Sequence, residues 1–263
     1  MLNELRGKAV LVTGGTRGIG LATGLAFGRL GAVCILTNKW GSADETAIMA
    51  AYAQAGAPAP RILQADASRD QDTRQVIERL MNDHERIEVL ISNVAFGQMT
   101  PEPRNYTKRG LLSSIEYSAW PLVCYIETIR ELFGAPPRYA VGLSSDGPDR
   151  YIPNYDLMAG AKAVLETLAK YLAHHYRDQD ARINIVRAGM VHTESLEATL
   201  GPSNVATLKA QKPQAFMAAE DVAKVIVALC SGLMDAVTGQ TLCVDYGQSF
   251  SAREISCANG DVG

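Results

Sequence analysis

Tyr155 and Lys162 are the side chains whose types and spacing point most directly to chemistry. Six residues separate them in the run Tyr-Asp-Leu-Met-Ala-Gly-Ala-Lys. Seven positions of an α-helix turn through about 700°, so we predict that both side chains leave the same helix face. A phenol near an ammonium, opening a helix beside a cofactor pocket, can act as a proton donor. A solvated helix face is the alternative for the pattern taken alone.

A glycine-rich turn, Thr13-Gly-Gly-Thr-Arg-Gly-Ile-Gly20, stands where the first apolar segment gives way to a helical pattern. Glycine permits a tight turn and close backbone approach. The N-terminus of the following helix offers N–H groups and its positive dipole end to a pyrophosphate. We therefore predict a dinucleotide site. The residues expected to contact the dinucleotide here are Gly14, Thr16, Arg17, Gly18, Ile19 and Gly20.

The end of the second apolar segment bears on the choice of cofactor. It reads Ile35-Leu-Thr-Asn-Lys39 and lacks the acid that commonly binds the ribose 2′-hydroxyl of NAD. Arg17 and Lys39 are available instead to face a 2′-phosphate, with Asn38 beside them. The alternative is that both cations are solvated surface charges. We expect NADPH as the cofactor.

Two further segment ends supply candidate cofactor residues. Asp66, which precedes Ala67, can accept a hydrogen bond from the adenine amino group. Alternatively, Asp66 or Ser68 caps the next helix. After the fourth apolar segment, Asn93 and Ala95 offer a place where the cofactor ribose can lie against backbone, with a simple turn as the alternative.

Composition narrows the class of protein. The 263-residue chain has a formal net charge of −3, with 47% hydrophobic and 20% charged residues. This balance gives no reason to expect nucleic acid or an anionic membrane as a partner. No apolar run reaches the roughly 18 residues of a membrane span, and the first residues lack a signal-peptide profile. The five cysteines share no CxxC or CxxH spacing, which predicts a reducing cytoplasm, no disulfide framework and no metal site.

Short apolar segments alternate with helical patterns along the whole chain, and each predicted strand is nearly all apolar, as in a parallel sheet buried on both faces. Strands are expected at Ala9–Thr13, Val33–Thr37, Arg61–Ala65, Glu88–Ser92, Arg138–Ser144, Arg182–Arg187 and Gln240–Val244. Helices are expected at about Gly18–Leu30, Ala43–Ala55, Asp70–Glu85, Arg109–Phe133, Pro153–Tyr176 and Ala219–Leu229. Right-handed crossovers then give an α/β, doubly wound, seven-stranded parallel sheet flanked by helices. Its ligand crevice is expected at the carboxyl ends of the strands.

The chain shows neither an internal repeat nor a Pro/Gly-rich linker, so we predict one domain over residues 1–248. Residues 249–263 are rich in small polar residues and are expected to form a flexible C-terminal tail. His192–Pro213 is expected to be an irregular, mobile flap.

These motifs occur in the order in which they are found in the short-chain dehydrogenase/reductase family, which the chain resembles over roughly residues 5–248. Within that family, Tyr-x6-Lys in place of Tyr-x3-Lys is typical of the enoyl-acyl-carrier-protein reductases. The run from Ser144 to Ala173 looks particularly like their NADPH-using third type. The resemblance implies a Rossmann fold, an oxidoreductase activity and a homotetramer or homodimer, with the tetramer packed through the helices around Leu111–Phe133 and Pro153–Tyr176.

The resemblance also implies roles for individual residues. Lys162 would hold the nicotinamide ribose hydroxyls and favour the phenolate form of a nearby tyrosine. Tyr155 would hydrogen-bond the substrate carbonyl and stabilise the oxyanion that follows hydride transfer. The segment Ala188-Gly189-x3-Thr193 corresponds to the family's Pro-Gly-x3-Thr. The residues that it would place on the cofactor are Gly189, Val191 and Thr193.

Two departures from the family pattern affect the expected chemistry. The helix that usually carries a proton-relay asparagine reads Ile115-Glu-Tyr-Ser118. Counting back from the lysine, the usual serine is kept as Ser145 at −17, but position −4 is Met158, which cannot donate a proton. Tyr155 at −7 then takes over, with Tyr151 at −11 as a second candidate phenol.

The spacing favours conjugate reduction. A tyrosine three residues earlier lies about 4.5 Å further along the helix. Reduction of an enoyl thioester places hydride on the β-carbon and charge on a carbonyl oxygen several bonds away, which suits a more distant phenol. We expect an NADPH-dependent reductase of an enoyl-acyl thioester, bound to acyl carrier protein or coenzyme A. Two alternatives are a polyketide-type ketoreductase that uses Ser145 with Tyr155 or Tyr151, and a non-catalytic nucleotide-binding subunit.

Overall fold

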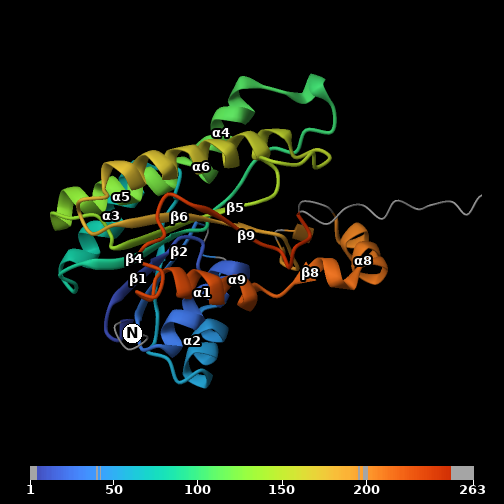
Figure 1. Cartoon of the computed structure of the whole chain (residues 1–263). Helices are drawn as coiled ribbons and strands as arrows, with labels where there is room; N and C mark the ends of the chain where they lie inside the picture. The colour runs from blue at the N-terminus through green and yellow to red at the C-terminus, as the bar shows by residue number, and fades with distance from the viewer. Residues whose placement is uncertain (1–4, 40, 42, 195, 198–200, 250–263) are drawn as a thin grey trace, which may run out of the picture.

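A parallel sheet forms the centre of the protein, whose computed structural model describes residues 5–39, 41, 43–194, 196–197 and 201–249. Its strands are β1 (Ala9–Val12), β2 (Val33–Asn38), β3 (Arg61–Gln64), β4 (Ile87–Ser92), β5 (Tyr139–Ser144), β6 (Arg182–Ala188) and β9 (Thr241–Val244). They are ordered β3-β2-β1-β4-β5-β6-β9, and all neighbours are parallel (Figure 1). The predicted α/β doubly wound sheet is therefore confirmed, and each strand begins and ends within one residue of its expected bounds.

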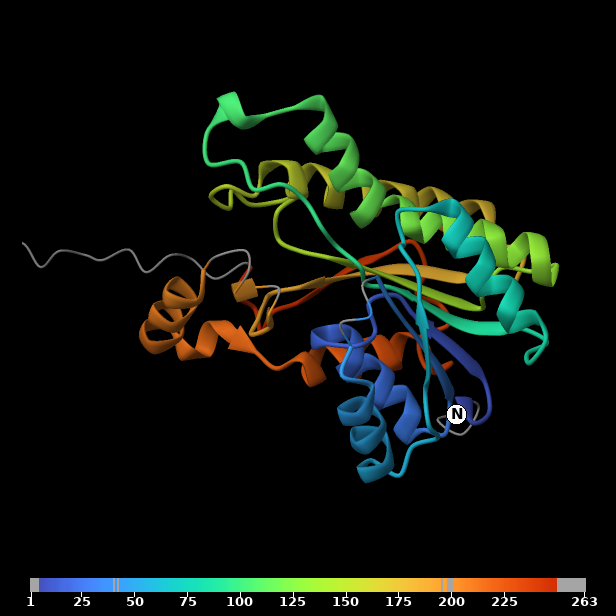
Figure 2. The same cartoon turned by 180° about the vertical axis from the view of Figure 1, so that it is seen from behind.

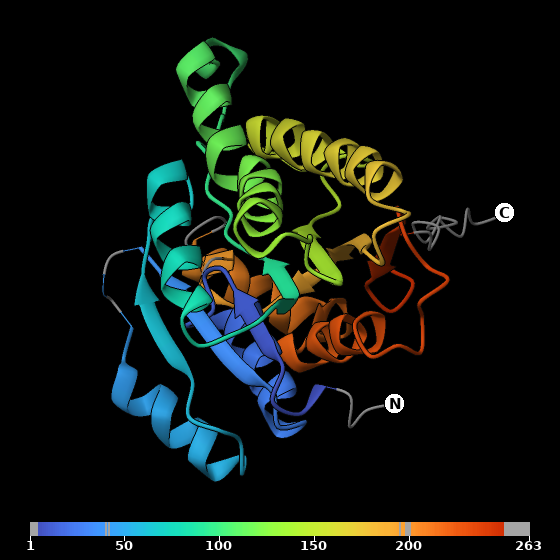
Figure 3. The same ribbon diagram turned by 90° about the vertical axis from the view of Figure 1, so that its left-hand side faces the viewer.

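Helices cover both faces of this sheet (Figures 1 and 3). One layer holds α1 (Gly18–Arg29), α2 (Glu45–Gln54) and α9 (Ala219–Leu229). The other holds α3 (Asp70–Met81), α4 (Lys108–Ser118), α5 (Trp120–Phe133) and α6 (Asp156–His175). Successive strand residues enter the two cores in turn: Leu11 packs with the second layer, and Val10 and Val12 pack with the first. Burial on both faces explains why the strands read as continuous apolar runs.

The helix expected at Arg109–Phe133 is two helices, because α4 ends at Ser118 and α5 begins at Trp120. Pro121 occupies the first turn of α5. Proline lacks the N–H that a continuous helix would donate to the carbonyl four residues earlier, so it is tolerated in the first turn of a new helix. Ala119, with φ −122° and ψ −50°, serves both helices as a cap residue.

The segment expected to be an irregular flap contains regular structure. Within it lies α8 (Pro202–Gln211), and the 3₁₀ helix η3 (Pro213–Ala215) begins at its last residue. The segment is flanked by β7 (Met190–Val191) and β8 (Phe216–Met217), which form a small parallel pair. Figure 2 shows α8 outside the two helical layers. A second 3₁₀ helix, η2, spans Pro103–Asn105. Of the expected C-terminal tail, the Ser249 backbone N–H donates to Asp245 at 2.5 Å, and residues 250–263 lie outside the described residues.

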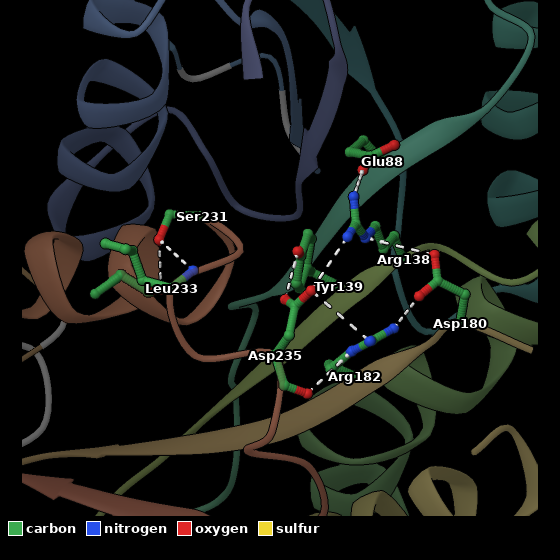
Figure 4. Close-up of polar contacts among 9 residues, drawn as sticks. Glu88, Arg138, Tyr139, Asp180, Arg182, Ser231, Leu233 and Asp235 are labelled. Carbon is green, nitrogen blue, oxygen red and sulfur yellow. Dashed lines mark hydrogen bonds and ion pairs between the residues drawn. The ribbon is translucent and has the colours of Figure 1, made fainter. Parts of the chain in front are cut away.

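A network of polar and charged side chains lies at the amino-terminal ends of the central strands (Figure 4). The site residues follow the opposite, carboxyl ends of the strands. Tyr139 Oη donates to Asp235 Oδ1 at 2.7 Å, and Arg138 donates to Asp235 Oδ2 at 3.1 Å. Arg182 donates to the Asp235 backbone carbonyl at 3.1 Å, and Arg138 lies 3.7 Å from Glu88. The network therefore ties the turn after α9 to the starts of β4, β5 and β6.

The described residues contain neither a membrane-spanning helix nor a cluster of metal ligands. No helix in this part of the chain is long and apolar enough to span a membrane. Over the same residues, no three His, Cys, Asp or Glu side chains come together as ligands for a metal ion.

Candidate functional site

The predicted site residues follow the carboxyl ends of the central strands, so the fold gathers them at one edge of the sheet. Strand order reverses between β1 and β4, and open α/β sheets bind their ligands beside such a reversal. Around this point lie the predicted cofactor residues Gly14, Thr16, Arg17, Gly18, Ile19 and Gly20 after β1, Asn38 and Lys39 at β2, Asp66 and Ala67 after β3, Asn93 and Ala95 after β4, and Gly189, Val191 and Thr193 after β6.

The glycine-rich turn fits a pyrophosphate. Gly14 and Gly18 have φ of +60° and +53°, in the left-handed region that favours glycine. A Cβ on Gly20 would lie 2.3 Å from the Gly14 carbonyl oxygen. Arg17, the N-cap residue of α1, makes no side-chain cap hydrogen bond to the first helical turn, so its side chain leaves these N–H groups to a ligand.

Asn93 braces this turn from the next strand. Its Nδ2 donates to the carbonyl oxygens of Thr13 and Gly14 at 3.0 and 3.1 Å. Its backbone N–H donates to Thr13 Oγ1 at 3.0 Å. The Asn93 side chain therefore stabilises the glycine-rich turn. The expected contact between the cofactor ribose and the backbone near Asn93 and Ala95 stays a prediction.

A charged cluster lies where the adenosine of the cofactor is expected. Lys39 lies 2.9 Å from Asp66 and donates a hydrogen bond to Tyr117 of α4. The Asp66 carboxylate also accepts from Ser68 Oγ at 2.8 Å. Burial alone would raise the pKa of Asp66, but the hydrogen bonds from Lys39 and Ser68 and the Lys39 charge outweigh burial and lower it. The alternative that Asp66 or Ser68 caps the next helix is wrong, because α3 begins at Asp70.

Asn38 and Arg17 each bind a neighbouring loop. Asn38 Oδ1 accepts from the Gly41 backbone N–H at 2.8 Å. Arg17 Nη1 lies 3.2 Å from Glu194 Oε2, and both side chains are exposed. Thr193 lies next to this pair, with its Cγ2 3.2 Å from where a Gly18 Cβ would stand. The segment after β7 is therefore in contact with the glycine-rich turn.

Ser145 and Tyr155 meet at the end of β5, where their hydroxyl oxygens are 3.1 Å apart. Tyr155 is the N-cap residue of α6, with φ −101° and ψ 7°, so the helix expected from Pro153 begins only at Asp156. Asn154 has φ 65°, which is incompatible with a right-handed helix at that residue. The expected helix start at Pro153 is therefore wrong. Because the Tyr155 carbonyl oxygen accepts from the Ala159 N–H at 2.8 Å as the first bond of α6, the shared face of Tyr155 and Lys162 stays a prediction.

Burial shifts the pKa values of two catalytic candidates, Tyr155 and Lys162. Burial and the nearby Asp146 charge raise the pKa of Tyr155, and the Ser145 hydrogen bond only partly offsets them. Lys162 is 3% exposed and donates from Nζ to the Leu143 carbonyl oxygen at 2.6 Å. Burial lowers the pKa of Lys162 to about 8, opposed by the charge of Glu166. The expected lowering of the Tyr155 pKa by Lys162 is absent from the protein alone, where the phenol is protonated at neutral pH.

Met158, at the position where the family usually has tyrosine, is buried in the protein. It is 7% exposed, and its Sδ lies 2.2 Å from where a Cβ on Gly97 would stand. Ser118, in the window of the usual relay asparagine, accepts from the Phe96 N–H at 3.1 Å and donates to the Phe96 carbonyl at 3.0 Å. Both departures read from the sequence thus have a structural role in closing this part of the site.

A cavity of about 500 Å³ lies beside Tyr155. Its lining includes Tyr106, Pro148, Asp149, Arg150, Tyr151, Ile152, Asp156 and Leu157. Tyr151, the second candidate phenol, is 84% exposed, and the hydrogen bond to Ser145 comes from Tyr155. Gly147 permits the packing of this loop, because a Cβ there would lie 2.9 Å from the Tyr155 ring.

Three charged residues next to the site, Arg187, Glu166 and Asp149, were not predicted from the sequence. Arg187 binds Glu166 with two hydrogen bonds and also donates to Asp149. One signal was present: Arg187 interrupts an apolar strand, and Glu166 stands four residues after Lys162 on the same helix. Neither pattern shows by itself that the two residues pair.

Comparisons with known proteins agree with this geometry. A family model described as enoyl-(acyl carrier protein) reductase matches residues 14–249. The enoyl-[acyl-carrier-protein] reductase [NADH] FabI of Aquifex aeolicus (strain VF5) is 26% identical over 255 residues, covering 92% of this chain and 92% of that protein. The 3beta-hydroxysteroid dehydrogenase 1 of Eggerthella lenta is 26% identical over 263 residues, covering 95% of this chain and 97% of that protein.

A solved structure shares the fold. It is a short chain dehydrogenase from Burkholderia cenocepacia J2315 in complex with NADP, with a TM-score of 0.79 at 21% identity, and the match covers 92% of this chain and 97% of that one. The family model covers residues 14–249, which is most of the sequence. The chain therefore belongs to the enoyl-(acyl carrier protein) reductase family of the short-chain dehydrogenases/reductases and is an oxidoreductase of that type.

Proposed function

We propose that the protein uses NADPH to reduce the carbon–carbon double bond of an enoyl-acyl thioester carried by acyl carrier protein or coenzyme A. The observation that carries this proposal is the pairing of Tyr155 with Ser145 while Met158 is buried against Gly97. The tyrosine at −7 is thus the phenol available to a substrate, as in the enoyl reductases that the chain resembles. The family match and the Aquifex aeolicus relative support the same reaction.

Tyr155 would act on the carbonyl oxygen of the thioester. The nicotinamide supplies a hydride for the β-carbon. The electron pair of the double bond then moves to the carbonyl oxygen, and Tyr155 stabilises that charge by donating a hydrogen bond. Its raised pKa keeps the phenol protonated for this role at neutral pH. The α-carbon of the enolate then takes a proton from solvent, which completes the saturated thioester. Since this step forms no alcohol, it does not require the relay asparagine, in whose window Ser118 instead bonds the Phe96 backbone.

NADPH is proposed over NADH because of the residues at the end of β2. No carboxylate follows this strand to bind a ribose 2′-hydroxyl, and Lys39 stands there instead. Arg17, at the start of α1, is the second cation available to a 2′-phosphate. The uncapped helix start and the left-handed glycines fit the pyrophosphate that both cofactors share.

Reduction of a β-keto thioester is the second candidate. Ser145 favours it, because its hydroxyl lies 3.1 Å from that of Tyr155 and the two can donate together to one carbonyl oxygen. The Eggerthella lenta relative is named for carbonyl–alcohol chemistry, on a steroid.

Turnover of a crotonyl thioester and of an acetoacetyl thioester separates the two candidates. Each substrate is tested with NADPH and, separately, with NADH. The proposal predicts turnover of the crotonyl thioester and a preference for NADPH. Tyr155→Phe should lower kcat/KM by roughly 10²- to 10³-fold and leave NADPH binding intact. Turnover of the acetoacetyl thioester without the crotonyl one would replace the proposal with the second candidate.

We further propose a cytoplasmic homotetramer or homodimer, packed through α4, α5 and α6. Large apolar side chains remain exposed on these helices: Leu112 is 47%, Trp120 is 40% and Tyr171 is 66% exposed. Exposed apolar groups gathered on neighbouring helices are typical of an interface between copies.

A further inference from the structure

We propose that Arg187 and Glu166 are positioning residues. They would hold the Lys162 ammonium in place and would also hold Asp149, which lines the cavity beside Tyr155 where the substrate is expected. The effect expected on thioester turnover depends on the proposed function. The effect expected on NADPH affinity depends only on binding of the cofactor. Neither residue lines the cavity beside Tyr155, so both would act through the groups that they hold.

Arg187 and Glu166 form a buried pair behind the site. Arg187 is 6% exposed and Glu166 is 9% exposed. The Arg187 Nε and Nη2 atoms donate to the two Glu166 carboxylate oxygens at 3.1 and 2.6 Å. Ser144 Oγ, next to Ser145 in the chain, donates to the same carboxylate at 2.6 Å. Bidentate geometry with a third donor fixes the carboxylate. Loss of Arg187 would leave the buried Glu166 charge without a counter-charge, and loss of Glu166 would leave Arg187 with the exposed Asp149 alone.

The remaining guanidinium nitrogen of Arg187 reaches the cavity wall. Arg187 Nη1 donates to the carboxylate of Asp149, which lines the cavity beside Tyr155. The backbone N–H groups of Asp149 and Arg150 both donate to the Asp146 carbonyl, at 3.1 and 2.9 Å. Asp149 therefore belongs to a closed turn, and the Arg187 contact sets the position of that whole turn against β6.

Glu166 stands four residues after Lys162 on α6, so the two buried side chains leave the same face of the helix. Arg187 from β6 and, through it, Asp149 from the loop are the charged groups tied to Glu166. β5 contributes the Leu143 carbonyl oxygen, a neutral acceptor for the Lys162 ammonium. Glu166 is the carboxylate that opposes the effect of burial on Lys162, so it keeps the ammonium charged over a wider pH range.

The test compares Glu166→Gln with Glu166→Asp and Asp149→Asn. The wild type should lose NADPH affinity and kcat/KM for a crotonyl thioester as pH rises through about 8, where Lys162 loses its proton. In E166Q the midpoint of both declines should move to lower pH, because the opposing charge is gone. E166D keeps that charge and should restore the midpoint. D149N should raise KM for the thioester roughly three- to fivefold without moving the midpoint.

An E166Q protein that is folded by circular dichroism, with both midpoints unchanged, would overturn the role of Glu166. An unchanged KM in D149N would overturn the role of the Arg187–Asp149 contact. The Asp149 side chain is 67% exposed, so D149N tests the proposal even if E166Q does not fold. If the wild type binds NADPH but reduces no thioester, the proposed function fails, and the pH dependence of NADPH affinity still tests the positioning of Lys162.

Discussion

Lys39 is the residue on which the proposed preference for NADPH depends. In the protein alone it is held by Asp66 and Tyr117, where the adenosine is expected to bind. A 2′-phosphate would compete with the Asp66 carboxylate for the same ammonium, whereas a 2′-hydroxyl would not. We therefore expect the cofactor preference to depend on how strongly the 2′-phosphate competes with the Asp66 carboxylate for the Lys39 ammonium.

Lys39→Ala should weaken NADPH binding about tenfold and leave NADH binding within about twofold. The substitution removes the cation and leaves Asp66 to repel the 2′-phosphate. Fluorescence titration with both cofactors measures this. Lys224→Ala, which removes an exposed lysine paired with Asp221, is the matched control and should change neither affinity. Equal losses for both cofactors in the Lys39 variant would contradict a 2′-phosphate role.

Gly97→Ala should destabilise the protein by about 1–3 kcal/mol through overpacking. The new Cβ would stand 2.2 Å from Met158 Sδ and 2.8 Å from Ser114 Oγ. Thermal unfolding followed by circular dichroism measures the effect. Gly160→Ala is the control: its Cβ would be 3.8 Å from the nearest atom, and alanine in a helix is expected to stabilise by about 0.5–1 kcal/mol. Equal melting temperatures for the two variants would show that the Met158 packing is not tight.

At the scale of elements, the sheet was predictable and the helix ends beside the site were not. Strand bounds follow from apolar runs between glycine- and proline-marked turns, a local property of the chain. The break before Pro121 also had a local signal, but the amphipathic pattern on both sides masked it. The late start of α6 depends on Asn154 adopting a left-handed conformation, which residue type alone does not fix. Pairs such as Arg187 with Glu166 come from different elements and appear only when those elements pack.

Asp235→Ala should lower the free energy of unfolding by about 1–3 kcal/mol. The change would remove the partner of the buried Tyr139 hydroxyl and one partner of Arg138, at the edge of the sheet away from the site. We expect a melting temperature several degrees lower, with KM for the thioester unchanged. Glu131→Ala, which removes an exposed partner of Arg74, should leave the melting temperature nearly unchanged. A change in KM without a change in stability would contradict a purely structural network.

At the scale of the whole molecule, the exposed side chains of α4, α5 and α6 predict self-association. Light scattering after size-exclusion chromatography should give two or four times the mass of one chain. Tyr171→Asp, at a 66% exposed position on α6, should lower that mass. Leu233→Asp, at a 57% exposed position away from these helices, is the control and should not. A monomeric wild type would refute the proposed assembly.

The central claim is that hydride reaches the β-carbon of an enoyl thioester while Tyr155 stabilises charge on the carbonyl oxygen. The most direct measurement is turnover of a crotonyl thioester with NADPH deuterated at the transferable position of the nicotinamide, followed by NMR of the product. The account predicts a butyryl thioester with one deuterium at the β-carbon, and loss of this transfer in Tyr155→Phe. No deuterated butyryl product, together with a deuterated hydroxybutyryl product from the acetoacetyl thioester, would contradict it.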